Sequence, residues 1–183
     1  MDIRKISAII ILTALSIATN YALIGIPQIK LMDFIVFIGG FCLGPLTGIA
    51  IGVSSWLIYG MLNPYGFVPQ IWLATMLSET IYGLIGGFLG RKLNGMEFNG
   101  LRYRLVILFG SVGFIATLLY DLVTNVVYAS VFDVPLFLAI AIGAPFTILH
   151  QLGNVLIFGL GAIPVIEALN KSLRGGWIVI PKE

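Results

Sequence analysis

The stretch from Leu31 to Leu62, "LMDFIVFIGGFCLGPLTGIAIGVSSWLIYGML", decides how the chain is organised. It is too long for one straight helix across a bilayer core of about 30 Å, and it is short for two helices of about 20 residues each. Gly44 and Pro45 divide the stretch, and proline suits the first turn of a new helix. The stretch therefore contains either one irregular span or two short helices, and the rest of the chain has to decide between them.

The overall composition is that of an integral membrane protein. Hydrophobic residues make up 59% of the 183 residues and charged residues only 10%, with a mean hydropathy of +1.06. A soluble domain of ordinary composition is excluded by these values. The formal charge of +2 is too small for a nucleic-acid footprint. Cys42 is the single cysteine, which excludes an internal disulfide and a thiolate metal site.

Four further apolar runs are long enough to cross a membrane. The basic start followed by an apolar run could imitate a signal peptide, but we expect a retained helix, because the run continues to Ile26 and its removal would leave an odd number of spans. Pro145 is expected to kink or begin the last run. The four runs are Ile6 to Ile26, Ile71 to Gly90, Leu105 to Ala129 and about Phe137 to Leu169.

The positions of the basic residues settle the number of spans. Cytoplasmic loops carry an excess of Lys and Arg. The basic residues other than Lys30 fall into three groups along the chain. If all three groups are cytoplasmic, the stretch from Leu31 to Leu62 must cross the membrane twice. The sequence predicts an all-α integral membrane protein: one domain of residues 1–183, a six-transmembrane-helix bundle in the cell membrane with both termini cytoplasmic. Apart from Lys30, the basic residues are Arg4 and Lys5, then Arg91, Lys92, Arg102 and Arg104, then Lys171, Arg174 and Lys182.

Polar side chains are concentrated in the outer halves of the predicted spans. Asp121, Asn125 and Tyr128 share one helical face, and His150 and Asn154 are an i, i+4 pair. Ionisable groups in a membrane usually mark a ligand pathway or pair with one another, although polar side chains also join helices simply as packing devices. We predict a substrate pocket open to the outside, built from Asp121, Asn125, Tyr128, His150, Asn154, Glu79, Trp56, Tyr59 and Asn20.

The outer loops and aromatic residues each allow two interpretations. The loops Gly25 to Asp33, Asn63 to Gln70 and Ser130 to Pro135 are either lids over a site or tight connections. The aromatics near the outer interface form either an interfacial belt or a surface on which a flat heterocyclic ligand stacks. These aromatics are Trp56, Tyr59, Tyr65, Trp72 and Tyr82.

Small residues recur every four positions on two of the predicted helices. Such ridges let helices approach closely in a membrane. Each ridge packs either inside the bundle or against a partner protein. One ridge is Ala14, Ala18 and Ala22, and the other is Gly40, Gly44, Gly48 and Gly52.

Motifs of enzymes and of nucleotide binding are absent from the sequence. It contains no phosphate-binding loop, no H-E-x-x-H, no G-x-S-x-G and no Cys/His cluster. We therefore expect no catalytic residues, no metal and no cofactor bound by this chain. Two other hypotheses remain open: a stand-alone ion-coupled secondary transporter using Asp121 or Glu79 as a proton-coupling group, and an intramembrane enzyme using either carboxylate with His150.

The pattern resembles the substrate-capture (S) components of energy-coupling factor (ECF) vitamin importers, which are ABC-type transporters. The resemblance is carried by Ala14-x-x-x-Ala18, by the passage "KLMDFIVFIGGFCLGPLTGIAIG" from Lys30 to Gly52, and by the polar outer cluster. It covers nearly the whole chain. It implies vitamin capture from outside, docking on a transmembrane coupling subunit, and release inside after the bundle topples.

The resemblance also assigns roles to particular residues and partners. It implies that Ala14 and Ala18, with Ala22 beside them, dock the coupling subunit, and that Gly25 to Met32 form a lid. Two cytoplasmic ATPase subunits would hydrolyse ATP, which agrees with the missing phosphate loop. The passages "DLVTN" and "PFTILHQLGN" resemble those of capture proteins associated with cobalamin, and riboflavin or another heterocyclic vitamin is the alternative substrate.

Overall fold

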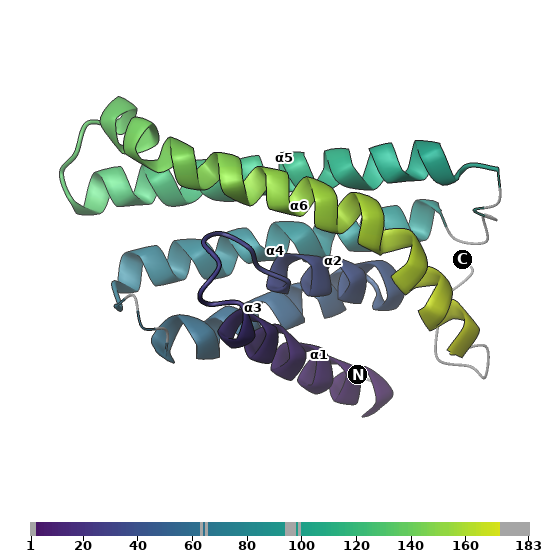
Figure 1. The fold of residues 1–183 in the computed structure, drawn as a ribbon. Coiled ribbons are helices and arrows are strands. Elements are labelled where there is room, and N and C mark those ends of the chain that lie inside the picture. The colour runs from purple at the N-terminus through teal and green to yellow at the C-terminus, as the bar shows by residue number, and fades with distance from the viewer. Residues whose placement is uncertain (1–2, 63, 65, 94–97, 99, 173–183) are drawn as a thin grey trace.

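The computed structural model describes residues 3–62, 64, 66–93, 98 and 100–172. The predicted loop residues Asn63 and Tyr65 and the basic residues Arg174 and Lys182 lie outside them. The described chain forms an all-helical bundle without strands (Figure 1). Its helices are α1 (Ile3–Ala22), α2 (Met32–Leu43), α3 (Pro45–Leu62), α4 (Pro69–Lys92), α5 (Arg102–Val131) and α6 (Leu136–Ser172).

The stretch from Leu31 to Leu62 forms two helices, as predicted. Gly44 ends α2, and its N–H donates a hydrogen bond to the Gly40 carbonyl at 2.8 Å. Its φ of +97° is a conformation that residues with side chains rarely adopt. Pro45 then begins α3, where its fixed φ suits a first helical turn and no N–H is needed.

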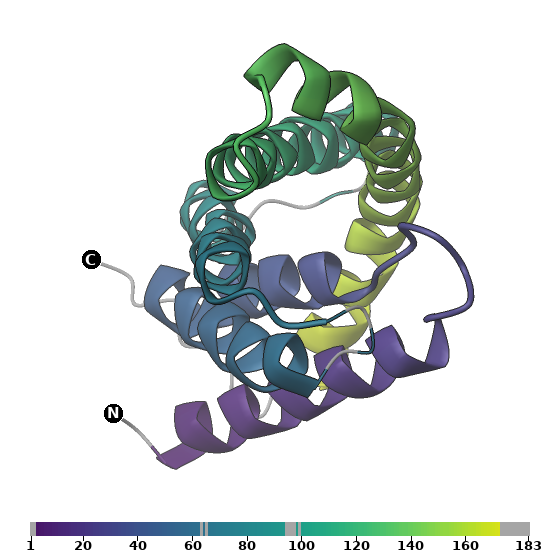
Figure 2. The same ribbon diagram turned by 90° about the vertical axis from the view of Figure 1, so that its left-hand side faces the viewer.

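Helix α2 is a short helix, as predicted, and it is shorter than a full membrane span. Five helices are long and apolar enough to cross a membrane. The 12 residues of α2 rise only about 18 Å, against a bilayer core of about 30 Å. Residues Met32 to Cys42 are all buried, and α2 contacts α1, α3, α4 and α6. It is an internal helix of the bundle (Figure 2) and needs no lipid-facing length.

Glycines bring α2, α3 and α4 into backbone contact. A Cβ added at Gly48 would lie 2.6 Å from Gly83 Cα and 2.7 Å from Gly40 Cα. A Cβ at Gly52 would lie 3.2 Å from Glu79 Cγ. The glycine ridge therefore packs inside the bundle, where the missing side chains allow the closest approach of helix backbones.

The alanine ridge, in contrast to the glycine ridge, lies on an exposed surface of the bundle. Helix α1 packs mainly against α2 and α3, through buried residues that include Thr13, Ser16 and Asn20. Ala14, Ala18 and Ala22 are exposed. The two ridges have the same spacing in sequence, but the glycine ridge packs between helices of this chain and the alanine ridge is exposed.

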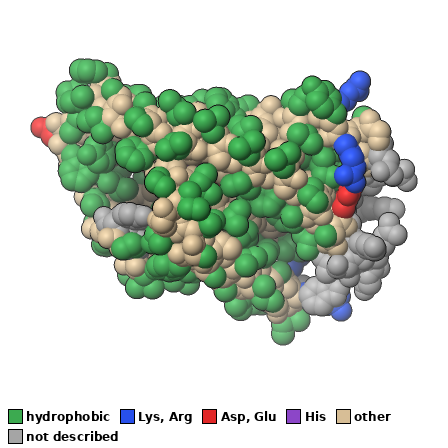
Figure 3. All heavy atoms as spheres, viewed as in Figure 1, with side chains coloured by type: hydrophobic (Ala, Val, Ile, Leu, Met, Phe, Trp, Pro, Cys, Tyr) green, Lys and Arg blue, Asp and Glu red, His purple; other side chains and the backbone are tan. Residues whose placement is uncertain are grey.

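Consecutive helices run in alternating directions, so α1 begins and α6 ends at the same end of the bundle (Figure 1). Arg91 and Lys92 end α4 here, and Arg102 begins α5. On the face shown in Figure 3, apolar side chains cover the sides and Lys and Arg gather at this end. We call it the basic end and the opposite one the cavity end.

Helix α6 decides between the two predicted roles of Pro145, a kink or a helix start. Its 37 residues run continuously through Pro145 and Pro164, so Pro145 does not begin the helix. The helix is bent rather than straight (Figure 1), as expected where proline removes a backbone hydrogen bond and its ring crowds the preceding turn. The bend lets the first turns of α6 reach over the cavity end, where Phe146 lines the cavity described below.

Candidate functional site

A cavity of about 690 Å³ lies at the cavity end of the bundle. This volume is within the range of about 300–1,000 Å³ that is typical of small-molecule sites. Its walls are mainly aromatic, and its polar lining residues come from α1, α4 and the loop between α1 and α2. The aromatic residues are Trp56, Tyr59, Phe67, Trp72, Tyr128, Phe132 and Phe146, and the polar ones include Asn20, Gln28, Lys30 and Thr75.

The loop between α1 and α2 forms one wall of the cavity. Leu23, Ile24 and every residue from Ile26 to Lys30 line it. Gln28 has a φ of +60°, a left-handed conformation that turns the loop back toward α2. The predicted lid, Gly25 to Met32, thus lies at the cavity, except that Met32 is already the first, fully buried residue of α2.

Hydrogen bonds from two indole groups fix the aromatic wall formed by α3 and α4. Trp56 Nε1 donates to Glu79 Oε2 at 3.0 Å, and Trp72 Nε1 donates to the Trp56 carbonyl at 2.9 Å. Glu79 lies fully buried behind Trp56, and its second oxygen, Oε1, has no hydrogen-bond partner among the described residues. The two tryptophans are therefore held in place by hydrogen bonds, and a carboxyl group lies behind them.

Lys30 places a cation at the cavity. Its side chain is half-buried, and its Nζ lies 5.7 Å from the ring centroid of Trp56 and 6.0 Å from that of Tyr120. These distances are within the range of cation–π attraction. Within the part of the chain that the structure describes, Lys30 makes no ion pair or hydrogen bond.

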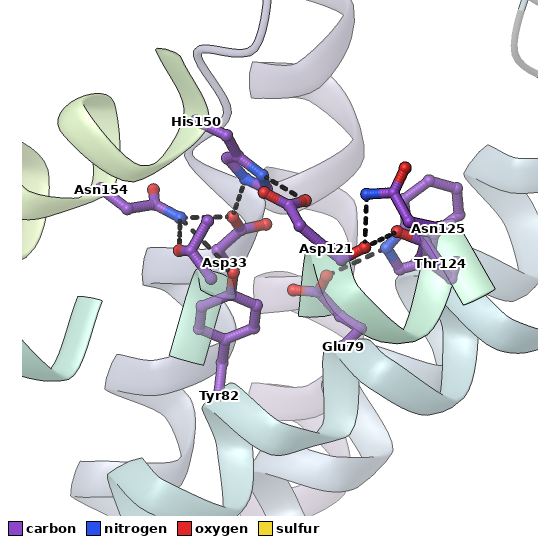
Figure 4. A network of polar contacts seen from close by, with 10 residues as sticks. Asp33, Glu79, Tyr82, Asp121, Thr124, Asn125, His150 and Asn154 are labelled. Atoms are coloured by element: carbon purple, nitrogen blue, oxygen red, sulfur yellow. Dashed lines mark hydrogen bonds and ion pairs between the residues drawn. The ribbon is translucent and has the colours of Figure 1, made fainter. Parts of the chain in front are cut away.

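Buried polar side chains of α2, α5 and α6 form a network of contacts (Figure 4). His150 Nε2 lies 2.7 Å from Asp33 Oδ2, and His150 Nδ1 lies 3.1 Å from Asp121 Oδ1. Asn154 Nδ2 donates to Asp33 Oδ2 and to Thr117 Oγ1, at 2.7 Å each. His150 lies one helical turn beyond Phe146, about 6 Å farther from the cavity end. The network joins α2, α5 and α6 in the middle of the molecule.

The two contacts of His150 restrict the protonation of this cluster. A neutral imidazole carries only one N–H, and an ionised carboxylate only accepts hydrogen bonds. Both contacts are therefore hydrogen bonds only if His150 is an imidazolium or if one of the two carboxyl groups holds a proton. His150 and Asn154 are each only 1% exposed and Asp33 is equally buried, so the groups satisfy one another rather than water.

The structure places seven of the nine predicted site residues in two groups. Trp56, Tyr59, Asn20 and Tyr128 line the cavity, whereas Asp121, His150 and Asn154 belong to the buried network. Glu79 lies behind Trp56. Asn125 donates through Nδ2 to the Asp121 carbonyl at 2.8 Å and lies against Gly143 of α6. Which of these residues touch a ligand stays a prediction.

Two charged residues of the site were missed by the sequence analysis. Asp33 was assigned to an outer loop, yet it lies in the first turn of α2, where a carboxylate suits the positive end of the helix dipole. Lys30 was noted only as an exception to the basic pattern. That exception was a usable signal, because a lone cation remote from the basic end needs a local reason.

Comparison with known proteins gives one match. The chain matches the family described as "ECF transporter, substrate-specific component" over residues 4–169. No curated protein and no solved structure matches it significantly. The match spans all six helices except the extreme ends of α1 and α6.

Proposed function

The chain belongs to the family of ECF transporter substrate-specific components, and on this premise we propose that it captures a heterocyclic vitamin or vitamin precursor from outside the cell. It is a multi-pass membrane protein and a transporter component, not an enzyme. The cavity at the end opposite the basic residues carries the proposal. Under the positive-inside rule the basic end faces the cytoplasm of a plasma-membrane protein, so the cavity faces outward.

The size and walls of the cavity favour one substrate class. A volume of about 690 Å³ with two tryptophans fixed in place suits a flat ligand of drug-like size. Riboflavin is of that size, whereas cobalamin is a much larger macrocycle. We therefore favour a riboflavin-sized heterocycle over cobalamin, with Trp56 and Tyr59 as stacking residues and Asn20 as a hydrogen-bonding residue.

The buried network has a supporting role in this proposal. Asp33 follows Lys30 by three residues, and its bonds to His150 and Asn154 anchor the end of the α1–α2 loop to α6. Asp121 and Asn125 complete the α5 side of the same region. We propose that these groups hold the cavity wall in place rather than perform chemistry.

Coupling to ATP hydrolysis would occur through partner subunits. The exposed face of α1 carries Ala14, Ala18 and Ala22, and small side chains permit close packing of another transmembrane helix. We propose that the ECF coupling subunit docks on this face and that two cytoplasmic ATPase subunits beneath it hydrolyse ATP. This chain would bind no cofactor of its own.

Binding and transport assays on docking-face variants test the proposal. In Ala14→Leu/Ala18→Leu the ligand affinity of the purified protein should stay unchanged, because neither position lines the cavity. ATP-dependent uptake with the coupling and ATPase subunits should be lost. Ala141→Leu, at another exposed alanine on α6, is the matched control and should retain uptake. Tryptophan fluorescence measures binding, since Trp56 and Trp72 line the cavity.

Two outcomes would contradict the proposal. Loss of ligand binding together with transport would show that the alanine face supports the fold or the site rather than docking. Uptake into liposomes by this chain alone, driven by a pH gradient, would support the stand-alone transporter instead.

A further inference from the structure

We propose that the ligand of the cavity carries an anionic group, a carboxylate or a phosphate, and that the Lys30 ammonium binds it. The inference rests on the proposed function, since it concerns the ligand captured in the same cavity. It narrows the substrate class from any flat heterocycle to one that bears an acid.

The first observation is the charge of the cavity wall. Among its lining residues in the described part of the chain, Lys30 is the only charged one, and no Asp or Glu is present. The wall therefore carries one positive charge surrounded by aromatic and aliphatic side chains. A charge set in such a low-dielectric wall interacts strongly with a ligand of opposite sign.

The second observation is that the ammonium has unused donors. A lysine ammonium has three N–H donors, and Lys30 uses none of them in an ion pair or hydrogen bond with the described residues. Its contacts are the faces of Trp56 and Tyr120. A half-buried cation with no ion-pair partner among the described residues is costly, so an anionic ligand group would supply the direct partner that is missing.

Two carboxyl groups that interact with Lys30, those of Asp33 and Glu79, form hydrogen bonds with other residues. Lys30 interacts with Asp33 and Glu79 electrostatically, but neither lies within 4 Å of Nζ as an ion-pair partner. Asp33 Oδ2 accepts hydrogen bonds from His150 and Asn154. Glu79 Oε2 accepts one from Trp56. These hydrogen bonds hold both carboxyl groups behind the cavity wall. The two groups therefore interact with the Lys30 ammonium through space, and its N–H donors stay available to a ligand.

The geometry also relates the acid to the ring of the ligand. Lys30 Nζ lies 5.7 Å from the centre of the Trp56 ring, and both residues line the cavity. A flat ligand stacked on Trp56 would therefore bring an acidic substituent at its edge within reach of the ammonium. A cationic ligand in the same position would meet a like charge.

Ligand retention by three purified proteins tests this inference. Wild type, Lys30→Arg and Lys30→Met are incubated at low salt with a small-molecule cell extract supplemented with riboflavin, riboflavin 5′-phosphate, nicotinamide and nicotinate. After washing, the retained compounds are identified and quantified by mass spectrometry. The retained ligand should carry a carboxylate or phosphate, and Lys30→Met should retain at least about tenfold less of it, a typical effect of losing a charge-assisted hydrogen bond. Lys30→Arg should retain it nearly as wild type does.

The possible outcomes distinguish a failure of this inference from a failure of the proposed capture function. A retained ligand without an anionic group, or an acidic ligand held equally well by Lys30→Met, would overturn the role of Lys30 while leaving capture intact. Retention of no compound by the wild-type protein would count against capture itself. Circular dichroism and the melting temperature of Lys30→Met show that any loss is not a loss of fold.

Discussion

Replacing His150 with leucine tests whether the buried network holds the bundle together. The substitution removes the contacts to Asp33 Oδ2 at 2.7 Å and to Asp121 Oδ1 at 3.1 Å. Among the described residues, Asp33 then keeps only the hydrogen bond from Asn154. Asp121 loses the one side-chain partner of its carboxylate, because its Oδ2 already lacks a partner among the described residues.

The expected loss of stability in His150→Leu follows from the buried carboxyl groups that lose their partner. Removing one partner of a buried charged pair typically costs about 3–5 kcal/mol, because the remaining charge stays buried without compensation. For a chain of 183 residues this corresponds to a fall in melting temperature of about 6–20 °C. Thermal unfolding of the detergent-solubilised protein, followed by circular dichroism, provides the measurement.

A neighbouring position and a double variant sharpen this test. Gln151→Leu alters the next residue of α6, which is also buried but makes no hydrogen bond within the described chain, so its melting temperature should change much less. In His150→Leu/Asp121→Asn the abandoned carboxylate becomes a neutral amide, so part of the lost stability should return. Equal melting temperatures of His150→Leu and Gln151→Leu would refute the reasoning, and so would a double variant that is less stable than His150→Leu.

Three further predictions concern packing, the cavity wall and the surface. Gly48→Ala should lower the free energy of unfolding by about 1–3 kcal/mol, because its methyl group would lie 2.6 Å from the α4 backbone. Gly110→Ala, where the nearest atom is 3.4 Å away, should leave stability unchanged or raise it by up to about 1 kcal/mol; similar melting temperatures for the two variants would contradict the packing argument. Trp56→Phe removes the N–H that donates to Glu79 at 3.0 Å and should cost about 1–3 kcal/mol in thermal unfolding, and an unchanged stability would show that this bond contributes nothing. Arg102→Ala breaks a salt bridge whose side chains are 59% and 39% exposed, so the change should stay below about 1 kcal/mol; a larger loss in the same assay would show that the bridge is more than a surface contact.

The helices could be predicted from the sequence because each depends on neighbouring residues. Apolar runs of membrane length, Gly44 before Pro45 and the three groups of basic residues predicted six helices, and the ends of the four long runs differ from the observed helix ends by one to four residues. Local sequence features did not explain why α2 can be as short as 12 residues. A helix surrounded by other helices needs no lipid-facing span, and that surrounding exists only in the folded bundle.

The candidate site was predictable in part. Helical periodicity placed Asp121, Asn125 and Tyr128 on one face, but seven residues of helix cover about 10 Å. Tyr128 therefore reaches the cavity while Asp121 lies in the buried network. The contact between His150 and Asp33 could not be predicted from the sequence, because the two residues are 117 positions apart and meet only where α2 packs beside α6.

The two small-residue ridges show where the sequence stops and the tertiary structure begins. Composition and apolar run lengths alone determined a membrane bundle, since the bilayer thickness acts on each segment separately. The alanine and glycine ridges share the same spacing, so the sequence could not tell an internal contact from a docking face. Packing decided it. The backbones of α2, α3 and α4 meet at Gly40, Gly48 and Gly83, whereas α1 packs mainly against α2 and α3 through its other face and leaves Ala14 and Ala18 exposed.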